Sequence, residues 1–271
     1  MVVLAKQPQY RKQLSKNQIE LLGLVGKFRF VTVPLLSEWR SKDKSTVYER
    51  LLVLTEQGYL HKTYDKSWKL LGKPAVYSLA TKGIKALRDK TDWFPKAVYK
   101  NQYKNRSASL QLVDHSLDVF KLCVQLRKQH GTSIEYFAKS EITKFEQFIR
   151  PLPDLYLRMD RRNEDDQLIH YQLETIEAGT FTWMLKKRIN AHQDWFDENN
   201  DEDWGFEDNY PTLLLLCDNK STEKRIHRLT DEAYMDFETW TTTRERFESN
   251  SKDIWIHYLD EYENDGVMRG L

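Results

Sequence analysis

The chain has 271 residues, of which 40% are hydrophobic and 31% charged, so it can bury one large core or two small ones. This composition excludes an intrinsically disordered protein, and the longest apolar run, Leu213 to Cys217, is far too short for a membrane helix of roughly 20 residues. The two cysteines, Cys123 and Cys217, lack metal-ligand spacing, and we expect a cytoplasmic protein.

The net charge of +1 hides a strong asymmetry along the chain. Residues 1–106 contain 22 Lys and Arg against 8 Asp and Glu, which gives +14, whereas residues 107–271 contain 20 basic and 33 acidic residues, which gives −13. An imbalance of this size predicts two domains with different partners. A compact segment at +14 favours a polyanionic partner, and phosphate backbones are the common polyanions of a cell.

Apolar periodicity predicts three short helices and then two strands near the N-terminus. Ser15 is the expected cap of the first helix and Gly26 its expected end, and a basic loop is expected between the strands. This order predicts a winged helix-turn-helix domain over residues 1–91. The expected helices are 15–26, 32–40, 45–57 and 81–90, the strands are 58–64 and 75–79, and the loop is 65–74.

In a winged helix the third helix enters the DNA major groove with its N-terminal half, and the wing reaches the neighbouring backbone. We therefore expect double-stranded DNA as the partner, with lysines on phosphates and with Arg50 and the hydroxyl groups on base edges. A homodimer is one candidate assembly, and the alternative is a winged helix that makes only protein contacts. The candidate DNA-binding residues are Lys42, Lys44, Ser45, Thr46, Tyr48 and Arg50 on the helix, and Lys62, Lys66, Lys69 and Lys73 on the wing.

The rest of the chain predicts a linker and an α/β domain with a mixed sheet. Residues 92–106 alternate aromatic and basic side chains and are interpreted as the linker, and residues 107–271 as the second domain. The expected strands are 133–138, 154–159, 168–174, 211–217 and 254–259, the helices are 107–130, 181–196 and 231–247, and a charged turn is expected at 161–167.

Two carboxylates of the second domain form a candidate catalytic pair. Asp154, after Pro153, begins one strand, and Glu174 ends the next, so antiparallel pairing brings them together. Carboxylate oxygens are ligands that Mg²⁺ prefers, and a bound Mg²⁺ could activate water for phosphodiester hydrolysis. The plainer alternative is that Asp154 is a turn residue and Glu174 is solvated.

At these positions the sequence resembles the restriction-endonuclease-like superfamily, whose pattern is Pro-Asp, a spacer and Glu-x-Lys. Ile176 occupies the lysine position in Glu174-Thr175-Ile176, and Lys186 or Lys187 on the following helix is a candidate substitute. Glu177 is a further candidate ligand. The resemblance implies a Mg²⁺-dependent nuclease or nickase with Asp154, Glu174 and Lys187 as catalytic residues. The missing lysine favours a degenerate domain that serves as a scaffold and is not an enzyme.

The order of the whole chain resembles the replication-relaxation family over about residues 15 to 260. A winged helix and a long helix precede the Pro-Asp strand, the Glu174–Thr180 segment and a lysine-rich helix. The resemblance implies a DNA-binding protein of a plasmid or another mobile element, with a role in replication, conjugative transfer or transcriptional regulation. A protein-interaction adaptor remains the third alternative.

Residues 194–208 hold eight acidic and no basic side chains, with aromatic residues between them. This segment is either a solvated loop or a surface for a basic partner.

Overall fold

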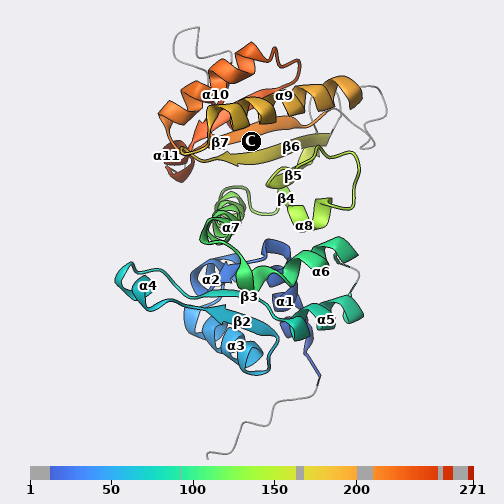
Figure 1. The fold of residues 1–271 in the computed structure, drawn as a ribbon, viewed down its shortest axis with the longest axis vertical. Helices are drawn as coiled ribbons and strands as arrows, with labels where there is room; N and C mark the ends of the chain where they lie inside the picture. Colours follow the sequence, from blue (N-terminus) through green and yellow to red (C-terminus); the bar gives the residue numbers. More distant parts are fainter. Residues whose placement is uncertain (1–12, 92, 163–167, 200–209, 250–252, 259–267) are drawn as a thin grey trace, which may run out of the picture. The chain divides into compact units, whose positions relative to one another are not determined.

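The computed structural model describes residues 13–91, 93–162, 168–199, 210–249, 253–258 and 268–271. The chain forms two compact units, residues 1–121 and 122–271, and the division falls within helix α7 (Leu110–His130). Each unit has its own sheet (Figure 1). The molecule is a mixed α and β protein, as the sequence predicts.

Unit 1 begins with three helices whose positions agree with the sequence prediction. Ser15 caps the first helix through a reciprocal capping box with Gln18, so the predicted start is confirmed. A three-stranded antiparallel sheet has the order β1-β3-β2, with Leu60 paired to Leu79. The elements are α1 (Lys16–Phe28), β1 (Val31–Thr32), α2 (Val33–Arg40), α3 (Lys44–Glu56), β2 (Leu60–Thr63), α4 (Lys66–Leu70), β3 (Val76–Leu79) and α5 (Thr81–Lys90).

The structure of this unit differs from the prediction in the loop and at the end of α1. The loop between β2 and β3 contains the short helix α4, which Asp65 caps by accepting hydrogen bonds from the backbone and hydroxyl of Ser67. Helix α1 does not stop at Gly26 but continues to Phe28. Gly26 instead permits close packing, because a Cβ atom there would lie 2.9 Å from the ring of Phe94.

The described part of the aromatic and basic segment, residues 93–106, packs on α1 through helix α6 (Lys96–Gln102) and the 3₁₀ turn η1 (Asn105–Ser107). The side chain of Gln102 donates a 2.9 Å hydrogen bond to the carbonyl of Gly26, and Asn105 donates to Gln102 at 2.6 Å. Arg29 donates to Asn105 at 2.6 Å and closes the network. A buried polar network of this kind fixes one register between the segment and α1.

Gly83 of α5 lies against backbone, and this contact gives a stability prediction. A Cβ atom there would lie 2.2 Å from the carbonyl oxygen of Tyr59, which already accepts a hydrogen bond from Ala80. We expect Gly83→Ala to lower the free energy of unfolding by about 2 kcal/mol, because the clash exceeds the roughly 1 kcal/mol that alanine gains in a helix. Urea unfolding measures the change.

The matched control is Gly179→Ala, because a Cβ atom at Gly179 meets nothing within 4 Å. This variant should stay within about 0.5 kcal/mol of the parent protein. Equal stability of the two alanine variants would contradict the close contact between α5 and Tyr59.

Unit 2 has a mixed sheet in which the described strands follow the order β10-β9-β8-β7-β6-β5-β4. Strands β6, β7 and β8 are parallel, and the remaining neighbours are antiparallel. The helices α9 and α10 connect the parallel strands and share one buried apolar cluster against the sheet. The elements are β4 (Ile134–Ala138), α8 (Lys139–Ile142), β5 (Leu155–Arg162), β6 (Leu168–Ile176), α9 (Thr182–Asn199), β7 (Thr212–Cys217), α10 (Lys220–Glu232), β8 (Thr239–Thr243), α11 (Arg244–Glu248), β9 (Trp255–His257) and β10 (Met268–Arg269).

The predicted helix over residues 231–247 is wrong. Its first residues end α10, and residues 239–243 form the buried parallel strand β8. Helix α10 is mostly charged, but Asn219 caps it, and Ile226 and Leu229 face the core of the sheet. The threonines of β8 are β-branched and fit a buried strand. The predicted turn 161–167 lies largely outside the described residues.

Candidate nucleic-acid interface and carboxylate pair

Helix α3 begins one residue earlier than predicted, because Asp43 is its N-cap. The carboxylate of Asp43 accepts a 2.8 Å hydrogen bond from the backbone of Thr46, and bonds of 2.6 and 2.7 Å from the hydroxyls of Ser45 and Thr46. These bonds hold the pKa of Asp43 well below its usual range. Sequence reasoning missed this cap, although an aspartate just before an apolar-periodic stretch is its ordinary signal.

This cap changes the roles expected at the start of α3. The hydroxyl protons of Ser45 and Thr46, predicted to contact bases, are donated to Asp43 in the free protein. Lys42, Lys44 and Tyr48 are exposed, and Arg50 is half-buried. The cationic side chains, rather than the two hydroxyls, are therefore the groups available to a polyanion at this end of the helix.

The four lysines that the sequence assigns to a wing lie on β2 and on the connection between β2 and β3, and all four are exposed. Lys62 lies 5.7 Å from the ring centroid of Tyr48, which connects β2 to α3. Lys73 lies 3.5 Å from a carboxylate oxygen of Asp114 in the same unit. Within the described part of the chain, Lys62, Lys66 and Lys69 form no ion pair. Their positive charge is open to solvent.

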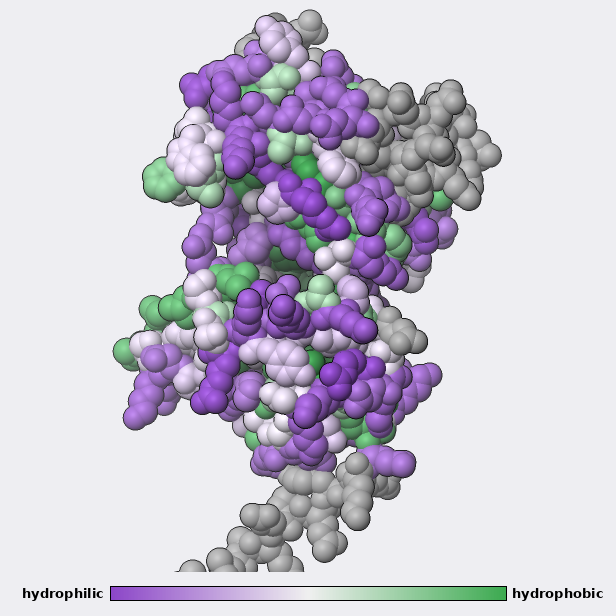
Figure 2. Space-filling view, turned by 45° about the vertical axis from the view of Figure 1, so that its right-hand side comes forward, coloured by the Kyte–Doolittle hydropathy of each residue, from purple (hydrophilic) through white to green (hydrophobic). Residues whose placement is uncertain are grey.

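Helix α4 adds an apolar feature that sequence reasoning missed. Leu70 and Leu71 are 91% and 68% exposed, directly after Lys69. Figure 2 shows a mostly hydrophilic face on which hydrophobic side chains gather in a few places. The sequence signal for this apolar feature is the segment Trp68-Lys69-Leu70-Leu71, because three apolar residues in four are unusual in a solvated loop.

The register of β5 and β6 puts Asp154 and Glu174 at the same end of the strand pair. Leu155 pairs with Leu173 in this antiparallel register, so Asp154 and Glu174 lie opposite each other one position beyond that pair. Asp154 accepts hydrogen bonds of 2.9 and 2.8 Å from the backbone and hydroxyl of Thr175. Both carboxylates are buried.

Each carboxylate has cationic or imidazole neighbours. Lys139 of α8 lies 2.6 Å from Asp154. The Nε atom of Arg188 lies 3.0 Å from both oxygens of Glu174, its Nη2 atom also donates to Glu174, and Nε2 of His192 lies 2.8 Å away. Lys187 is exposed, so the α9 side chain that reaches Glu174 is Arg188.

The structure also places the other candidate residues, Lys186 and Glu177. Lys186 pairs with Glu232 of α10 at 3.1 Å, and Glu177 is half-buried after the end of β6. Ile176, at the position of the superfamily's lysine, is buried in the apolar cluster beneath α9 and α10. An apolar residue at that position belongs to the core and supplies no polar group.

The protonation states follow from burial and from these neighbours. Burial raises the pKa of Glu174, but His192 and Arg188 outweigh burial and bring the pKa to about 2. Burial lowers the pKa of His192. The Nε2 atom of His192 faces Glu174, and its Nδ1 atom has no hydrogen-bond partner among the described residues.

This arrangement does not fit a magnesium ion. Mg²⁺ needs free oxygen ligands in near-octahedral geometry, whereas Arg188, Lys139 and Thr175 already engage the oxygens of both carboxylates. Among the described residues, no three His, Cys, Asp or Glu side chains are grouped to hold a metal. The pair is arranged to stabilise the junction of β5, β6 and α9.

A nicking assay tests this interpretation of the pair. We expect the purified chain to leave supercoiled plasmid intact with Mg²⁺ or Mn²⁺, because Lys139 and Thr175 already bind Asp154, and Arg188 already binds Glu174. Cleavage that disappears in Asp154→Ala would contradict this expectation. The matched control Glu146→Ala removes an exposed carboxylate of the same unit and should behave as the parent protein.

The acidic segment 194–208 is described only up to Asn199. Asp194, Asp197 and Glu198 lie on the last turns of α9, where Asp197 accepts a 2.7 Å hydrogen bond from Gln193. The remaining acidic residues lie outside the described part of the chain.

Comparison with known proteins gives one match. A family model described as replication-relaxation matches residues 22–181, which is more than half of the chain and extends from α1 to the residue before α9. No curated protein and no solved structure matches the chain. No described helix is both long and apolar enough to cross a membrane.

Proposed function

Since the chain belongs to the replication-relaxation family, we propose that it is a DNA-binding protein that acts in the replication or relaxation of a plasmid or another mobile element. In this proposal unit 1 is a winged helix-turn-helix that binds duplex DNA. Residues 1–91 are the DNA-binding domain, 92–106 the connection, and 107–271 a degenerate restriction-endonuclease-like domain.

The topology of unit 1 supports this proposal. A short turn at residues 41–43 joins α2 to α3, and the antiparallel strands β2 and β3 follow with a twelve-residue connection, 64–75. A recognition helix followed by a hairpin is the arrangement in which winged-helix proteins contact a groove and a neighbouring backbone together.

The observation that carries the proposal is the open positive charge at these two places. Lys42 and Lys44 lie exposed at the start of α3, and Lys62, Lys66 and Lys69 lie exposed on the wing without an ion pair among described residues. They belong to a segment whose formal charge is +14. Such a surface concentrates the field that attracts phosphate groups.

The salt dependence of duplex binding tests the proposal. If α3 and the wing contact about six phosphates, affinity for a labelled duplex should fall about a thousandfold between 50 and 200 mM salt. Fluorescence anisotropy measures this slope. An affinity that stays constant over this range would favour the protein-interaction adaptor instead.

We also propose that the protein binds paired half-sites as a homodimer. Winged-helix and related proteins commonly match their own two-fold symmetry to that of the DNA. Sedimentation with and without duplex should then show two copies per site, whereas one copy per site would contradict the dimer.

A further inference from the structure

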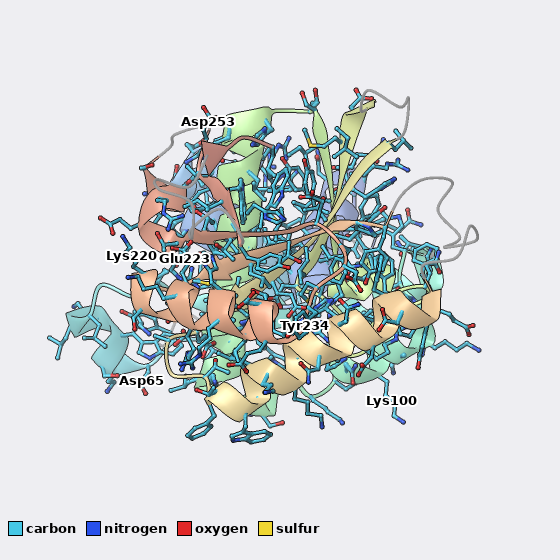
Figure 3. All side chains as sticks on the ribbon, turned by 90° about the horizontal axis from the view of Figure 1, so that it is seen from above. Asp65, Lys100, Lys220, Glu223, Tyr234 and Asp253 are labelled. Atoms are coloured by element: carbon cyan, nitrogen blue, oxygen red, sulfur yellow. The ribbon has the colours of Figure 1, made fainter. Side chains whose placement is uncertain are left out.

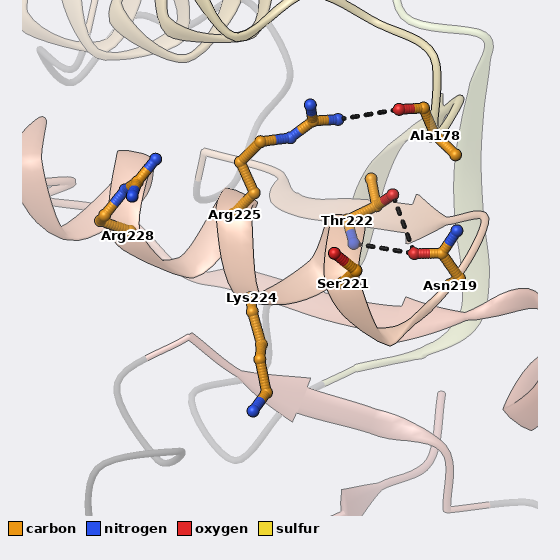
Figure 4. Close-up of a pocket in the computed structure, with 7 residues that line it drawn as sticks. All are labelled: Ala178, Asn219, Ser221, Thr222, Lys224, Arg225 and Arg228. Carbon is orange, nitrogen blue, oxygen red and sulfur yellow. Dashed lines mark hydrogen bonds between the residues drawn. The ribbon is translucent and has the colours of Figure 1, made fainter.

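A pocket of about 430 Å³ lies in unit 2 (Figure 4). It is formed by Ala178, which follows β6, and by the first turns of α10. Its polar wall begins with the cap of α10, where Asn219 accepts hydrogen bonds of 2.9 and 3.1 Å from Thr222. The carboxyl ends of neighbouring parallel strands meet here, which is the usual place for ligands in α/β sheets. The lining residues are Ala178, Asn219, Ser221, Thr222, Lys224, Arg225 and Arg228.

Two arginines give this pocket an open positive charge. Arg225 donates a 3.3 Å hydrogen bond to the carbonyl of Ala178, and its Nε atom has no partner among described residues. Arg228 lies on the same side of α10 as Arg225, whereas Lys224 extends away (Figure 4). Arg228 forms a long ion pair with Glu232, at 3.9 Å, and Glu232 also pairs with Lys186 at 3.1 Å.

The acids nearest the start of α10 do not cancel this charge. Asp218 pairs with Arg244 at 2.7 Å, and the buried Glu223 pairs with Arg246. Each of these carboxylates therefore has its own cation on α11. The positive charge is local, since residues 107–271 as a whole carry −13.

Two exposed aromatic side chains follow the pocket residue Ala178 closely in the sequence. Phe181 and Trp183, at the start of α9, are 67% and 66% exposed. Phe181 follows Ala178 by three residues, so the Cα atoms of the two residues lie within about 11 Å of each other. Further along α9, Lys186 pairs with Glu232 of α10. In the sequence, the two aromatic residues lie between Ala178 and Lys186, both of which contact α10. Helices α9 and α10 lie alongside each other (Figure 3).

We propose that this surface binds single-stranded nucleic acid, with a backbone phosphate at Arg225 and Arg228 and unpaired bases stacked on Phe181 and Trp183. A positive groove next to exposed aromatic rings is the arrangement that binds single strands without sequence preference. A duplex cannot use these rings, because its bases are already stacked. The site is independent of the duplex-binding surface of unit 1.

The test uses the full chain carrying Lys44→Glu, Arg50→Glu and Lys69→Glu, so that unit 1 contributes little. The probe is a fluorescein-labelled oligothymidylate of about 16 nucleotides, the upper length for one such site. Anisotropy should show binding that falls about tenfold in Phe181→Ala/Trp183→Ala and also in Arg225→Ala/Arg228→Ala. Trp183→Phe, which keeps a ring, should retain most of the affinity.

The control is Lys144→Ala, which removes an exposed cation from the segment after α8 and should leave binding unchanged. Circular dichroism and thermal melting verify that each variant is folded. Unchanged oligothymidylate affinity in both double variants would overturn the proposal. A loss confined to the arginine variant would overturn stacking, and a change in oligomeric state without a change in affinity would indicate a contact between copies and also overturn it.

Discussion

Reversing the charge of Lys44, Arg50 and Lys69 together is expected to lower the affinity for duplex DNA by about a hundredfold or more at moderate salt. Lys44 and Arg50 lie on α3, and Lys69 lies on α4 between β2 and β3, so the triple variant changes both proposed contact regions at once. Each lost phosphate contact should also reduce the salt slope by about one. Anisotropy at several salt concentrations measures both quantities.

The matched control reverses three lysines of the same unit that lie outside α3 and the wing. Lys85, Lys90 and Lys100 are exposed on α5 and α6, and their reversal changes the net charge by the same amount. This control should lose only the weak, long-range part of the attraction. An equal loss of duplex affinity in the two triple variants would show that binding depends on the net charge of the unit and not on the positions of these residues on α3 and between β2 and β3.

The second large effect concerns Glu174. Replacing it by glutamine leaves Arg188 in a largely buried place without its counter-charge, and we expect the free energy of unfolding to fall by about 3 kcal/mol at pH 7. The magnitude agrees with a carboxyl pKa that falls from 4.5 to about 2 on folding. Urea unfolding of the parent and Glu174→Gln proteins measures the difference.

The pH dependence of that difference has a definite sign. Because the folded pKa of Glu174 is depressed, its stabilisation is fully present above about pH 4.5 and is lost as the pH falls towards about 2. The unfolding curves of the two proteins should therefore converge in acid. The exposed control Glu146→Gln should stay within about 0.5 kcal/mol of the parent. A difference that is constant from pH 7 to pH 3 would contradict the ion pair with Arg188.

Local signals in the sequence are sufficient to predict much of the fold. Ser15 caps α1 as predicted, and apolar periodicity located the three N-terminal helices and both strands of the hairpin. Antiparallel pairing was enough to predict that the start of β5 and the end of β6 lie together, which the hydrogen bonds of Asp154 to Thr175 show. These features depend on neighbours that are close in sequence or joined by one turn.

Features that depend on distant packing were not predictable in the same way. Gly26 looks like a helix end in sequence, but the ring of Phe94 against it is a long-range contact. Helix α10 has few apolar residues, and its identity depends on burial of Ile226 and Leu229 against the sheet. Lys187 and Arg188 are adjacent in sequence, and only the rotation of α9 decides which one faces Glu174.

Amide hydrogen exchange, measured with and without a duplex, tests most directly whether unit 1 reads DNA through α3 and the wing. The account predicts slower exchange at residues 42–50 and 62–75 when duplex is added, and unchanged exchange in the buried strand β7 of unit 2. Protection confined to unit 2, or absent from both regions of unit 1 while duplex is bound, would contradict it.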